Sequence, residues 1–257
     1  MSRATFRFYE ELNDFLPEAS RKVPVAFEFV VAPSVKDAIE ALGVPHVEVD
    51  LIVVGDRSVG FDHRVSEGDR IAVYPVFESL DISPIVRLRP EPLRRTAFIA
   101  DVHLRKLSRL LRLLGLDTLH SNDFDDAQIV AIAAQESRII LTRDRQLLKH
   151  GAVTHGYWVR STDPIEQARE ILRRFDLGSQ AQPFSRCLSC NGLLSPVEKE
   201  DVLERIPPKT AAWLDEFHEC GSCRKLYWRG THAKKLEALV DRVCSGTQKN
   251  DESPPEE

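Results

Sequence analysis

Hydrophobic and polar residues alternate at residues 4–9, and residues 23–31 are rich in β-branched and aromatic residues; both patterns are typical of strands. After the second of these segments, Ser34 has the side chain of a helix cap, and residues 35–42 carry a helical pattern that Gly43 ends. This order of two strands, one helix and two strands predicts a β-grasp, ubiquitin-like domain (an α+β fold) over residues 1–81. The strands are expected at residues 4–9, 23–31, 49–54 and 71–74.

A second pattern, in which strands and helices alternate, begins after a segment rich in proline and arginine. Residues 82–94 contain three prolines and show neither a helical nor a strand period, so we expect a linker there. Residues 95–178 then predict an α/β core in which helices cover a parallel sheet. Its strands are expected at residues 96–100, 117–120, 138–142 and 156–160, and its helices at residues 102–114, 126–137 and 164–175.

The last part of the chain, residues 179–244, is organised around cysteines and ends in a helical pattern at residues 234–243. Two C-x2-C pairs, separated by 29 residues, each place two thiolates at the tip of a turn. Two such tips predict a closed tetrahedral Zn²⁺ site with a structural role. Residues 245–257 contain no apolar residue, and we expect them to be disordered. The predicted zinc ligands are Cys187, Cys190, Cys220 and Cys223.

Composition and charge narrow the class of protein. The chain has 257 residues, of which 42% are apolar and 29% charged, as in ordinary soluble proteins. No stretch approaches about 18 consecutive apolar residues, and acids occupy the place of the apolar run of a signal peptide, so we expect a cytoplasmic protein without a membrane span. Residues 93–160 carry 11 Lys and Arg against 7 Asp and Glu, although the whole chain has a net charge of −5. This basic segment indicates a surface for a polyanion.

Acidic residues follow the predicted strands of the α/β core. Asp101 and Asp144 come after its first and third strands, and Asp123 and Asp126 come after the second. Because ligands of parallel sheets bind at the carboxyl ends of the strands, we expect these carboxylates to converge and to bind Mg²⁺ or Mn²⁺, which relieves their repulsion. Such an ion activates water and stabilises a phosphate under attack, which is the chemistry of phosphodiester hydrolysis. The alternative is that aspartate is common in turns and that Asp126 only caps its helix.

Basic residues accompany these acids. Three arginines recur at i, i+4 and i+7 on the helix expected after the first strand, and two more flank the aspartate that follows the third strand. Arginines in such places neutralise phosphates and hold a nucleic-acid backbone in register. The alternative is a solvated helix face that pairs with acids elsewhere. The predicted nucleic-acid contacts are Arg105, Arg109, Arg112, Arg143 and Arg145.

Two residues after the second cysteine pair offer further contacts to nucleic acid. Trp228 has a ring on which a base can stack, and His232 can touch a phosphate. The alternative is that Trp228 packs the cysteine-rich segment against the α/β core and that His232 is a satisfied polar group.

Four segments, in this order along the chain, resemble the mut-seven C-terminal RNase family. They read FIADVHLRKLSRLLRLLGLDT, DFDDAQIVAIAAQESRIILTRD, PFSRCLSCNGLL and ECGSCRKLYWRGTH. The resemblance covers about residues 95–235 and implies a PIN-like α/β nuclease fold with a zinc ribbon, acting as a metal-dependent ribonuclease. It places the acids of a PIN-type site at Asp101, Asp126 and Asp144, with Asp123 as an auxiliary acid.

The first 80 residues resemble the ubiquitin-like β-grasp domain that often precedes this nuclease. The resemblance rests on GVPHVEVDLIVVGDRSVGFD and GDRIAVYPVFESLDI. Related sulfur carriers end in Gly-Gly, whereas here the corresponding end continues through Pro75, Val76 and Phe77. We therefore expect this domain to dock a protein partner rather than to be conjugated.

The leading interpretation is cleavage of RNA that depends on Mg²⁺ or Mn²⁺. An alternative is a non-catalytic adaptor that binds RNA or the ribosome, in which the ribbon and the arginines bind and the acids are structural. A third interpretation is a scaffold for protein interactions through the β-grasp domain. The sequence leaves open the RNA substrate, endo- or exonucleolytic cleavage, one or two ions, and the oligomeric state.

Overall fold

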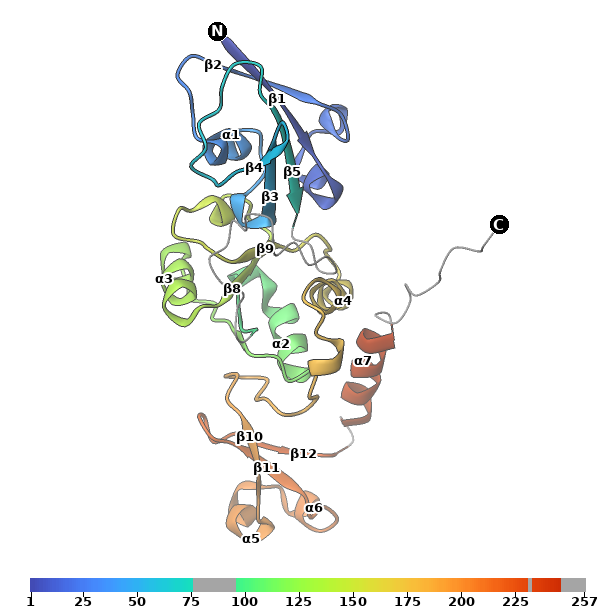
Figure 1. Cartoon of the computed structure of the whole chain (residues 1–257). Coiled ribbons are helices and arrows are strands. Elements are labelled where there is room, and N and C mark those ends of the chain that lie inside the picture. The colour runs from blue at the N-terminus through green and yellow to red at the C-terminus, as the bar shows by residue number, and fades with distance from the viewer. Residues whose placement is uncertain (76–95, 231–232, 246–257) are drawn as a thin grey trace, which may run out of the picture. The chain divides into compact units, whose positions relative to one another are not determined.

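The computed structural model describes residues 1–75, 96–230 and 233–245, which form two compact units (Figure 1). Among the described residues, the first unit combines residues 1–75 with residues 126–158, and the second combines residues 96–125 with residues 159–230 and 233–245. The predicted linker and the predicted tail beyond Ser245 lie outside the described residues.

The N-terminal part of the first unit has the predicted ubiquitin-like fold. Its strands lie in the order β2-β1-β5-β3-β4, with β1 and β5 parallel and the other neighbours antiparallel. Helix α1 (Val35–Ala41) begins at Ser34, whose Oγ accepts the Asp37 N–H at 3.1 Å, and Gly43 ends it with φ +107°. The strands are β1 (Ser2–Phe8), β2 (Val25–Phe29), β3 (Val49–Val54), β4 (Arg57–Ser58) and β5 (Arg70–Pro75).

Fifteen buried apolar residues form the core of this domain, among them Phe6, Ile39 and Ile52, which are fully buried. Alternating apolar positions of β1, β3 and β5 supply one side of the core, and α1 supplies the other. Three short 3₁₀ helices that the sequence did not predict complete the domain. They are η1 (Glu10–Phe15), η2 (Glu18–Ser20) and η3 (His46–Glu48).

The first unit also contains part of the predicted α/β core. Strands β8 (Ile139–Thr142) and β9 (Gly156–Trp158) are parallel, with Ile140 opposite Gly156. Helix α3 (Asp126–Glu136) contacts β8 and buries Ile129, Val130 and Ala133. The short helix η5 (Leu147–Lys149) lies between the two strands in the sequence.

The second unit contains the remaining strands and the long helices of the core. Strands β6 (Phe98–Ala100) and β7 (Thr118–Leu119) are parallel, so the predicted parallel pairing is confirmed in both units. The helix expected at residues 102–114 begins as η4 (Val102–Leu104) and continues as α2 (Arg105–Leu113). Helix α2 packs on α4 (Pro164–Arg174), and α4 packs on α7 (Ala233–Ser245), as Figure 1 shows.

Gly115 ends α2 and is required there for two reasons. Its φ of +83° lies in the left-handed region, and a Cβ atom at this position would lie 2.2 Å from the Gln182 carbonyl oxygen. The chain from Gln182 onward therefore passes directly over the end of α2.

A three-stranded antiparallel sheet in the order β10-β11-β12 forms the ribbon of the second unit. Its core holds three buried apolar residues, Val202, Ile206 and Phe217. Among the described residues, no helix is long and apolar enough to cross a membrane. The elements are β10 (Leu194–Val197), β11 (Phe217–Cys220), β12 (Leu226–Trp228), α5 (Lys199–Val202), α6 (Pro208–Ala211), η6 (Gly178–Gln180) and η7 (Leu203–Arg205).

Candidate functional site

The four predicted cysteines converge at one end of the ribbon. Their sulfur atoms all lie within 4.8 Å of one another; Cys187 and Cys223 are 3.6 Å apart, and Cys190 and Cys220 are 3.4 Å apart. These distances are far longer than a disulfide bond of about 2.05 Å. Zinc–sulfur bonds of about 2.3 Å in a tetrahedron place the sulfurs about 3.8 Å apart. The cluster therefore has a size and a ligand chemistry that fit a metal such as zinc.

Tyr227 of β12 supports this cluster from outside. Its hydroxyl accepts the Leu188 N–H at 3.1 Å, and its own proton is thereby directed toward the Cys187 sulfur, also at 3.1 Å. Burial raises the pKa of Cys187, but the hydrogen bonds from Tyr227 and from the Cys190 and Ser189 N–H groups outweigh it and lower this pKa to about 6. The Cys187 thiolate is therefore available to a metal at neutral pH.

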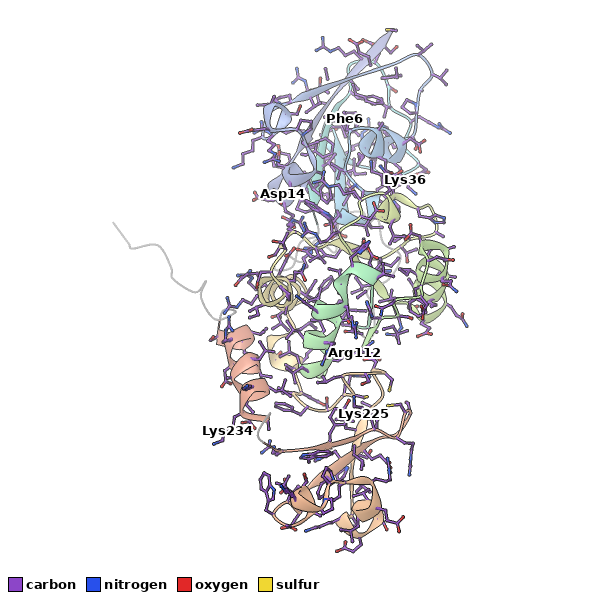
Figure 2. All side chains as sticks on the ribbon, turned by 180° about the vertical axis from the view of Figure 1, so that it is seen from behind. Phe6, Asp14, Lys36, Arg112, Lys225 and Lys234 are labelled. Carbon is purple, nitrogen blue, oxygen red and sulfur yellow. The ribbon has the colours of Figure 1, made fainter. Side chains whose placement is uncertain are left out.

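Arg112, which Figure 2 labels, joins the turn of the first cysteine pair to the α/β core. Its side chain is buried and donates to main-chain carbonyls: Thr118 at 2.8 Å, Ser189 at 2.9 Å, Leu188 at 3.3 Å and His120 at 3.5 Å. Burial lowers the pKa of Arg112, and the Cys190 and Cys187 thiols act in the opposite direction. The sequence placed Arg112 on an exposed face, whereas the structure buries it because the ribbon covers the last turn of α2.

A second set of hydrogen bonds strengthens the same junction. The Asn191 side chain donates to Asp117 at 2.8 Å and accepts the Thr118 N–H at 3.0 Å. Arg186 bonds the other oxygen of Asp117 at 3.2 Å and the carbonyl of Gly115 at 3.1 Å. The cysteine turn is therefore bonded to β7 and to the segment that precedes it, and no local sequence signal identified these residues.

The predicted acids are divided between the two units. In the second unit, Asp101 follows β6 and is buried, and Asp123 is exposed beyond β7. In the first unit, Asp126 is the first residue of α3, and Asp144 lies two residues beyond β8; both are exposed. Asp101, Asp126 and Asp144 thus lie at the ends of elements where the sequence predicted them, and their mutual arrangement stays a prediction.

The other predicted arginines differ in exposure. Arg105 and Arg109 are exposed on α2, and Arg143 is exposed beside Asp144. Arg145 is instead half-buried and donates to two carbonyls of the ubiquitin-like domain. The expectation of an exposed phosphate contact therefore does not describe Arg145, because its guanidinium is already held by protein groups.

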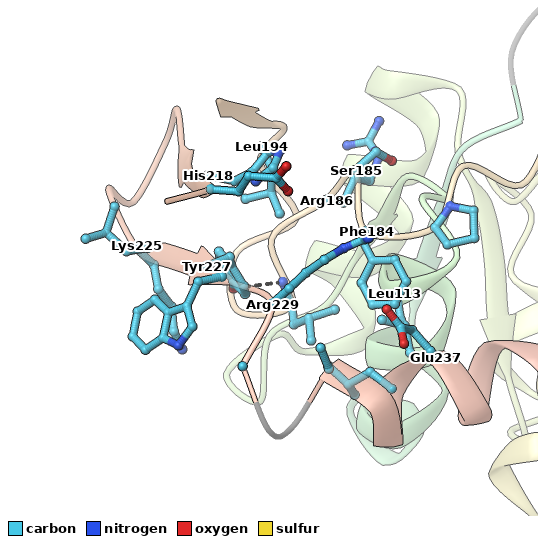
Figure 3. A pocket seen from close by; sticks show the side chains of 18 of the residues that line it. Leu113, Phe184, Ser185, Arg186, Leu194, His218, Lys225, Tyr227, Arg229 and Glu237 are labelled. Carbon is cyan, nitrogen blue, oxygen red and sulfur yellow. Dashed lines mark hydrogen bonds between the residues drawn. The ribbon is translucent and has the colours of Figure 1, made fainter. Parts of the chain in front are cut away.

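A groove of about 860 Å³ lies between the ribbon, α7 and the end of α2. Leu113 and Phe184 line one side of the groove, and β12 lines the other. Figure 3 shows the Arg229 side chain reaching across the groove toward Phe184, with Lys225 directly before β12 and the acidic Glu237 on α7. The groove therefore combines apolar walls with charged groups at its edges.

Trp228 lies at the edge of this groove. It is 37% exposed, and its ring packs at 6.2 Å from the ring of the buried Phe217. It therefore has both a packing role and a free surface. Residues 224–235 carry five Lys and Arg and no acid. His232, within this segment, lies outside the described residues.

Comparisons with known proteins agree with this architecture. The model of the family described as "Mut7-C RNAse domain" matches residues 96–240, which is more than half of the chain. The chain belongs to the Mut7-C RNAse domain family. A second model, described as "Mut7-C ubiquitin", matches residues 1–81, which contain the β-grasp domain. The Mut7-C match includes the strands that precede Asp101 and Asp144, and it also includes all four cysteines.

A curated relative of this Mut7-C protein is the human "Exonuclease mut-7 homolog". The two are 34% identical over 134 residues, which is 50% of this chain. This chain spans only 15% of the length of that relative. No solved structure matches the chain.

The Mut7-C sequence revealed the four clustered cysteines but not the residues that support them. The cysteine spacing identified all four sulfurs, because C-x2-C pairs need no knowledge of distant residues. Tyr227, Asn191 and Asp117 act through contacts between segments about 40 to 74 residues apart, and only the structure brings them together.

Proposed function

We propose that this protein is a ribonuclease that hydrolyses RNA phosphodiester bonds with Mg²⁺ or Mn²⁺. The observation that carries the proposal is the position of Asp101 and Asp144, each of which follows a parallel strand within the Mut7-C RNAse match. Carboxylates at the carboxyl ends of parallel strands are placed to bind such ions. In this proposal, residues 95–178 form the nuclease core.

Asp101, Asp126 and Asp144 would hold the ion, and Asp123 would assist them. When bound, the ion supplies an activated water and stabilises the negative charge that builds up on the phosphate. The exposed carboxylates of Asp126 and Asp144 are open to solvent and to substrate. Asp101 is buried, so it provides a fixed ligand.

Arg105, Arg109 and Arg143 would bind the RNA backbone. The first two are one helical turn apart and exposed, so one strand can contact both. We leave Arg112 and Arg145 out of this surface, because main-chain carbonyls occupy their guanidinium groups.

The groove beside β12 would hold bases and phosphates of the same RNA. Trp228 offers a partly exposed ring for stacking, and Lys225 and Arg229 offer charge. Asp101 lies shortly before the first residue of α2. Leu113, which lines the groove, is the last residue of the same helix. These nine residues of α2 span about 14 Å at 1.5 Å per residue, a distance that a few nucleotides cover.

We further propose that the four cysteines bind Zn²⁺ with a structural role, because four thiolates leave no position for substrate. A cluster of reduced thiols suits a reducing compartment, which supports a cytoplasmic location. The ubiquitin-like domain would offer a surface to a protein partner.

The test is cleavage of single-stranded RNA with Mn²⁺ by the wild type and by Asp101→Asn. We expect the substitution to lower the rate on the order of 100-fold or more, since it removes a metal ligand. Asp56→Asn is the matched control, because Asp56 is 96% exposed in the ubiquitin-like domain. Equal rates for wild type and Asp101→Asn would refute the assignment.

The adaptor alternative gives a different result in the same experiment. Exposed Trp228 and the basic segment at residues 224–235 favour it as a second candidate. It predicts RNA binding of unchanged affinity when Mg²⁺ and Mn²⁺ are omitted, and no cleavage by the wild type at any Mn²⁺ concentration.

A further inference from the structure

The loop that carries Asp144 is attached to the ubiquitin-like domain through its neighbour Arg145. The two terminal nitrogens of Arg145 donate to the carbonyls of Asp14 at 3.1 Å and Phe15 at 3.2 Å. The guanidinium also lies 4.0 Å from the ring centre of Trp158 and 5.1 Å from that of Phe15. Two hydrogen bonds and cation–π contacts with two adjacent rings, whose centres are 5.0 Å apart, therefore hold the guanidinium.

Three further contacts attach the rest of this segment to the same domain. Lys149 Nζ donates to the Glu40 carbonyl at 2.7 Å, and His46 Nε2 lies 3.0 Å from the Val153 carbonyl oxygen. The Trp158 N–H donates to Glu48 at 2.7 Å. Contacts from η1, α1 and η3 therefore hold the segment from Arg145 to Trp158 at four places.

Asp144 itself is ordered by its own loop. Its N–H donates to Thr142 Oγ1 at 2.9 Å, and its Oδ1 accepts the Gln146 N–H at 2.7 Å. The Gln146 N–H thus orients the carboxylate, and the Thr142 hydroxyl holds the main chain at Asp144. Arg145 lies within this turn, so the contact that fixes Arg145 also fixes the main chain that orients Asp144.

We propose that the ubiquitin-like domain is the positioning domain of the nuclease and that Arg145 is the positioning residue for Asp144. The inference rests on the proposed function, since it assigns Asp144 to the metal site. Metal sites need ligands placed within about 0.5 Å, which loop residues reach only when a rigid surface holds them. The fifteen-residue core of the ubiquitin-like domain supplies that surface.

The test compares Arg145→Lys with the wild type. Lysine keeps the charge but loses the planar fork that reaches two carbonyls and stacks on two rings. Arg57→Lys is the matched control, because Arg57 is 89% exposed in the same domain. Phe15→Leu is a second variant. It removes the ring that the ubiquitin-like domain places beside Arg145, and it keeps the core of that domain apolar.

Two readouts separate positioning from a general structural role. Mn²⁺ binding is followed by the electron paramagnetic resonance signal of the free ion, and RNA cleavage is followed over a range of Mn²⁺ concentrations. For Arg145→Lys we expect the half-saturating Mn²⁺ concentration to rise about tenfold, with a normal rate at saturating Mn²⁺ and an unchanged KM for RNA. Phe15→Leu should raise the half-saturating Mn²⁺ concentration by less than tenfold, and Arg57→Lys should leave it unchanged.

The outcomes distinguish the two proposals. A wild type that binds Mn²⁺ and cleaves RNA, with Arg145→Lys identical to it in both readouts, overturns the positioning role and leaves the nuclease intact. A loss of rate in Arg145→Lys that saturating Mn²⁺ does not restore also overturns it, because a misplaced ligand is rescued by more ion. A wild type that neither binds Mn²⁺ nor cleaves RNA overturns the proposed function itself.

Discussion

The ubiquitin-like domain and the cysteine ribbon are two accessory parts of this chain that are stabilised in different ways. The ubiquitin-like domain has fifteen buried apolar residues in its core, whereas the ribbon has three. A core of three residues does not offset the conformational entropy of ordering about 40 residues. We therefore expect the ribbon to depend on the proposed metal, whereas the ubiquitin-like domain has an apolar core of its own.

Both parts nevertheless use the same device where they meet the α/β core. In each case an arginine of the core donates to main-chain carbonyls of the accessory part: Arg112 to Leu188 and Ser189, and Arg145 to Asp14 and Phe15. Every residue has a main-chain carbonyl, whatever its side chain. The sequence of the partner segment therefore does not show which carbonyls will accept a hydrogen bond from an arginine. A cluster of arginines beside acids is thus a weaker sign of nucleic-acid binding than its charge suggests.

The largest effect should come from removing a metal ligand. Cys220→Ser should unfold the ribbon, since metal binding supplies apparent free energies of about 10 kcal/mol or more in small zinc folds. Amide hydrogen exchange should become fast in residues 194–228 and stay slow in β1 and β3. Cys244→Ser is the control, because Cys244 lies on α7 outside the cluster. Loss of protection in the ubiquitin-like strands as well would show that the two parts do not differ in this way.

A smaller effect is expected at the junction itself. Arg112→Met should lower the free energy of unfolding by about 3 kcal/mol, because the buried Thr118 carbonyl and three partly buried carbonyls lose this donor. Denaturant unfolding of the zinc-loaded protein measures this value. Arg109→Met, an exposed position on the same helix, should change it by less than about 0.5 kcal/mol. Equal effects of the two substitutions would mean that Arg112 contributes no more than a surface residue.

The smallest effect should come from the support of the cluster. Tyr227→Phe removes the hydroxyl that lowers the pKa of Cys187, and we expect zinc affinity to fall about tenfold. Without zinc, the pKa of Cys187 is lowered to about 6, so protons compete with zinc for this sulfur as the pH falls. In the variant this pKa rises, so zinc release on acidification should begin at a higher pH.

A chromogenic zinc indicator, used in a pH titration, measures this release. Tyr9→Phe is the control, since Tyr9 stacks on Tyr74 in the ubiquitin-like domain and should leave the release unchanged. Identical release curves for Tyr227→Phe and the wild type would exclude a role of the hydroxyl in metal binding.

Local sequence signals predicted most elements of this fold. Ser34 marks the start of α1 and Gly43 its end, and Gly115 marks the end of α2. These signals are local, because a capping side chain or a left-handed residue acts on the main chain next to it. The strand pattern identified β3 to the residue, and its carboxyl end is marked by Gly55. The 3₁₀ helices η1 and η3 were missed because they are too short for a period to show.

The long-range features were beyond a reading of local pattern. Arg112 shares a helical face with Arg105, yet only Arg112 is covered, by a cysteine turn about 76 residues later in the chain. Arg145 meets Phe15 across 130 residues. The burial of Arg112 and of Arg145 cannot be predicted from the spacing of residues on one element. In both cases it depends on which distant segment of the chain covers the side chain.

The attachment at Trp158 has a practical consequence for work on separate pieces of this protein. Trp158 packs on the ubiquitin-like core, and η5 contacts η3 of the same domain. A fragment beginning at Thr96 would leave this apolar face bare to water and prone to self-association. Anyone preparing the Mut7-C part by itself should therefore keep residues 1–75 attached, or replace Trp158 with a polar side chain before judging solubility.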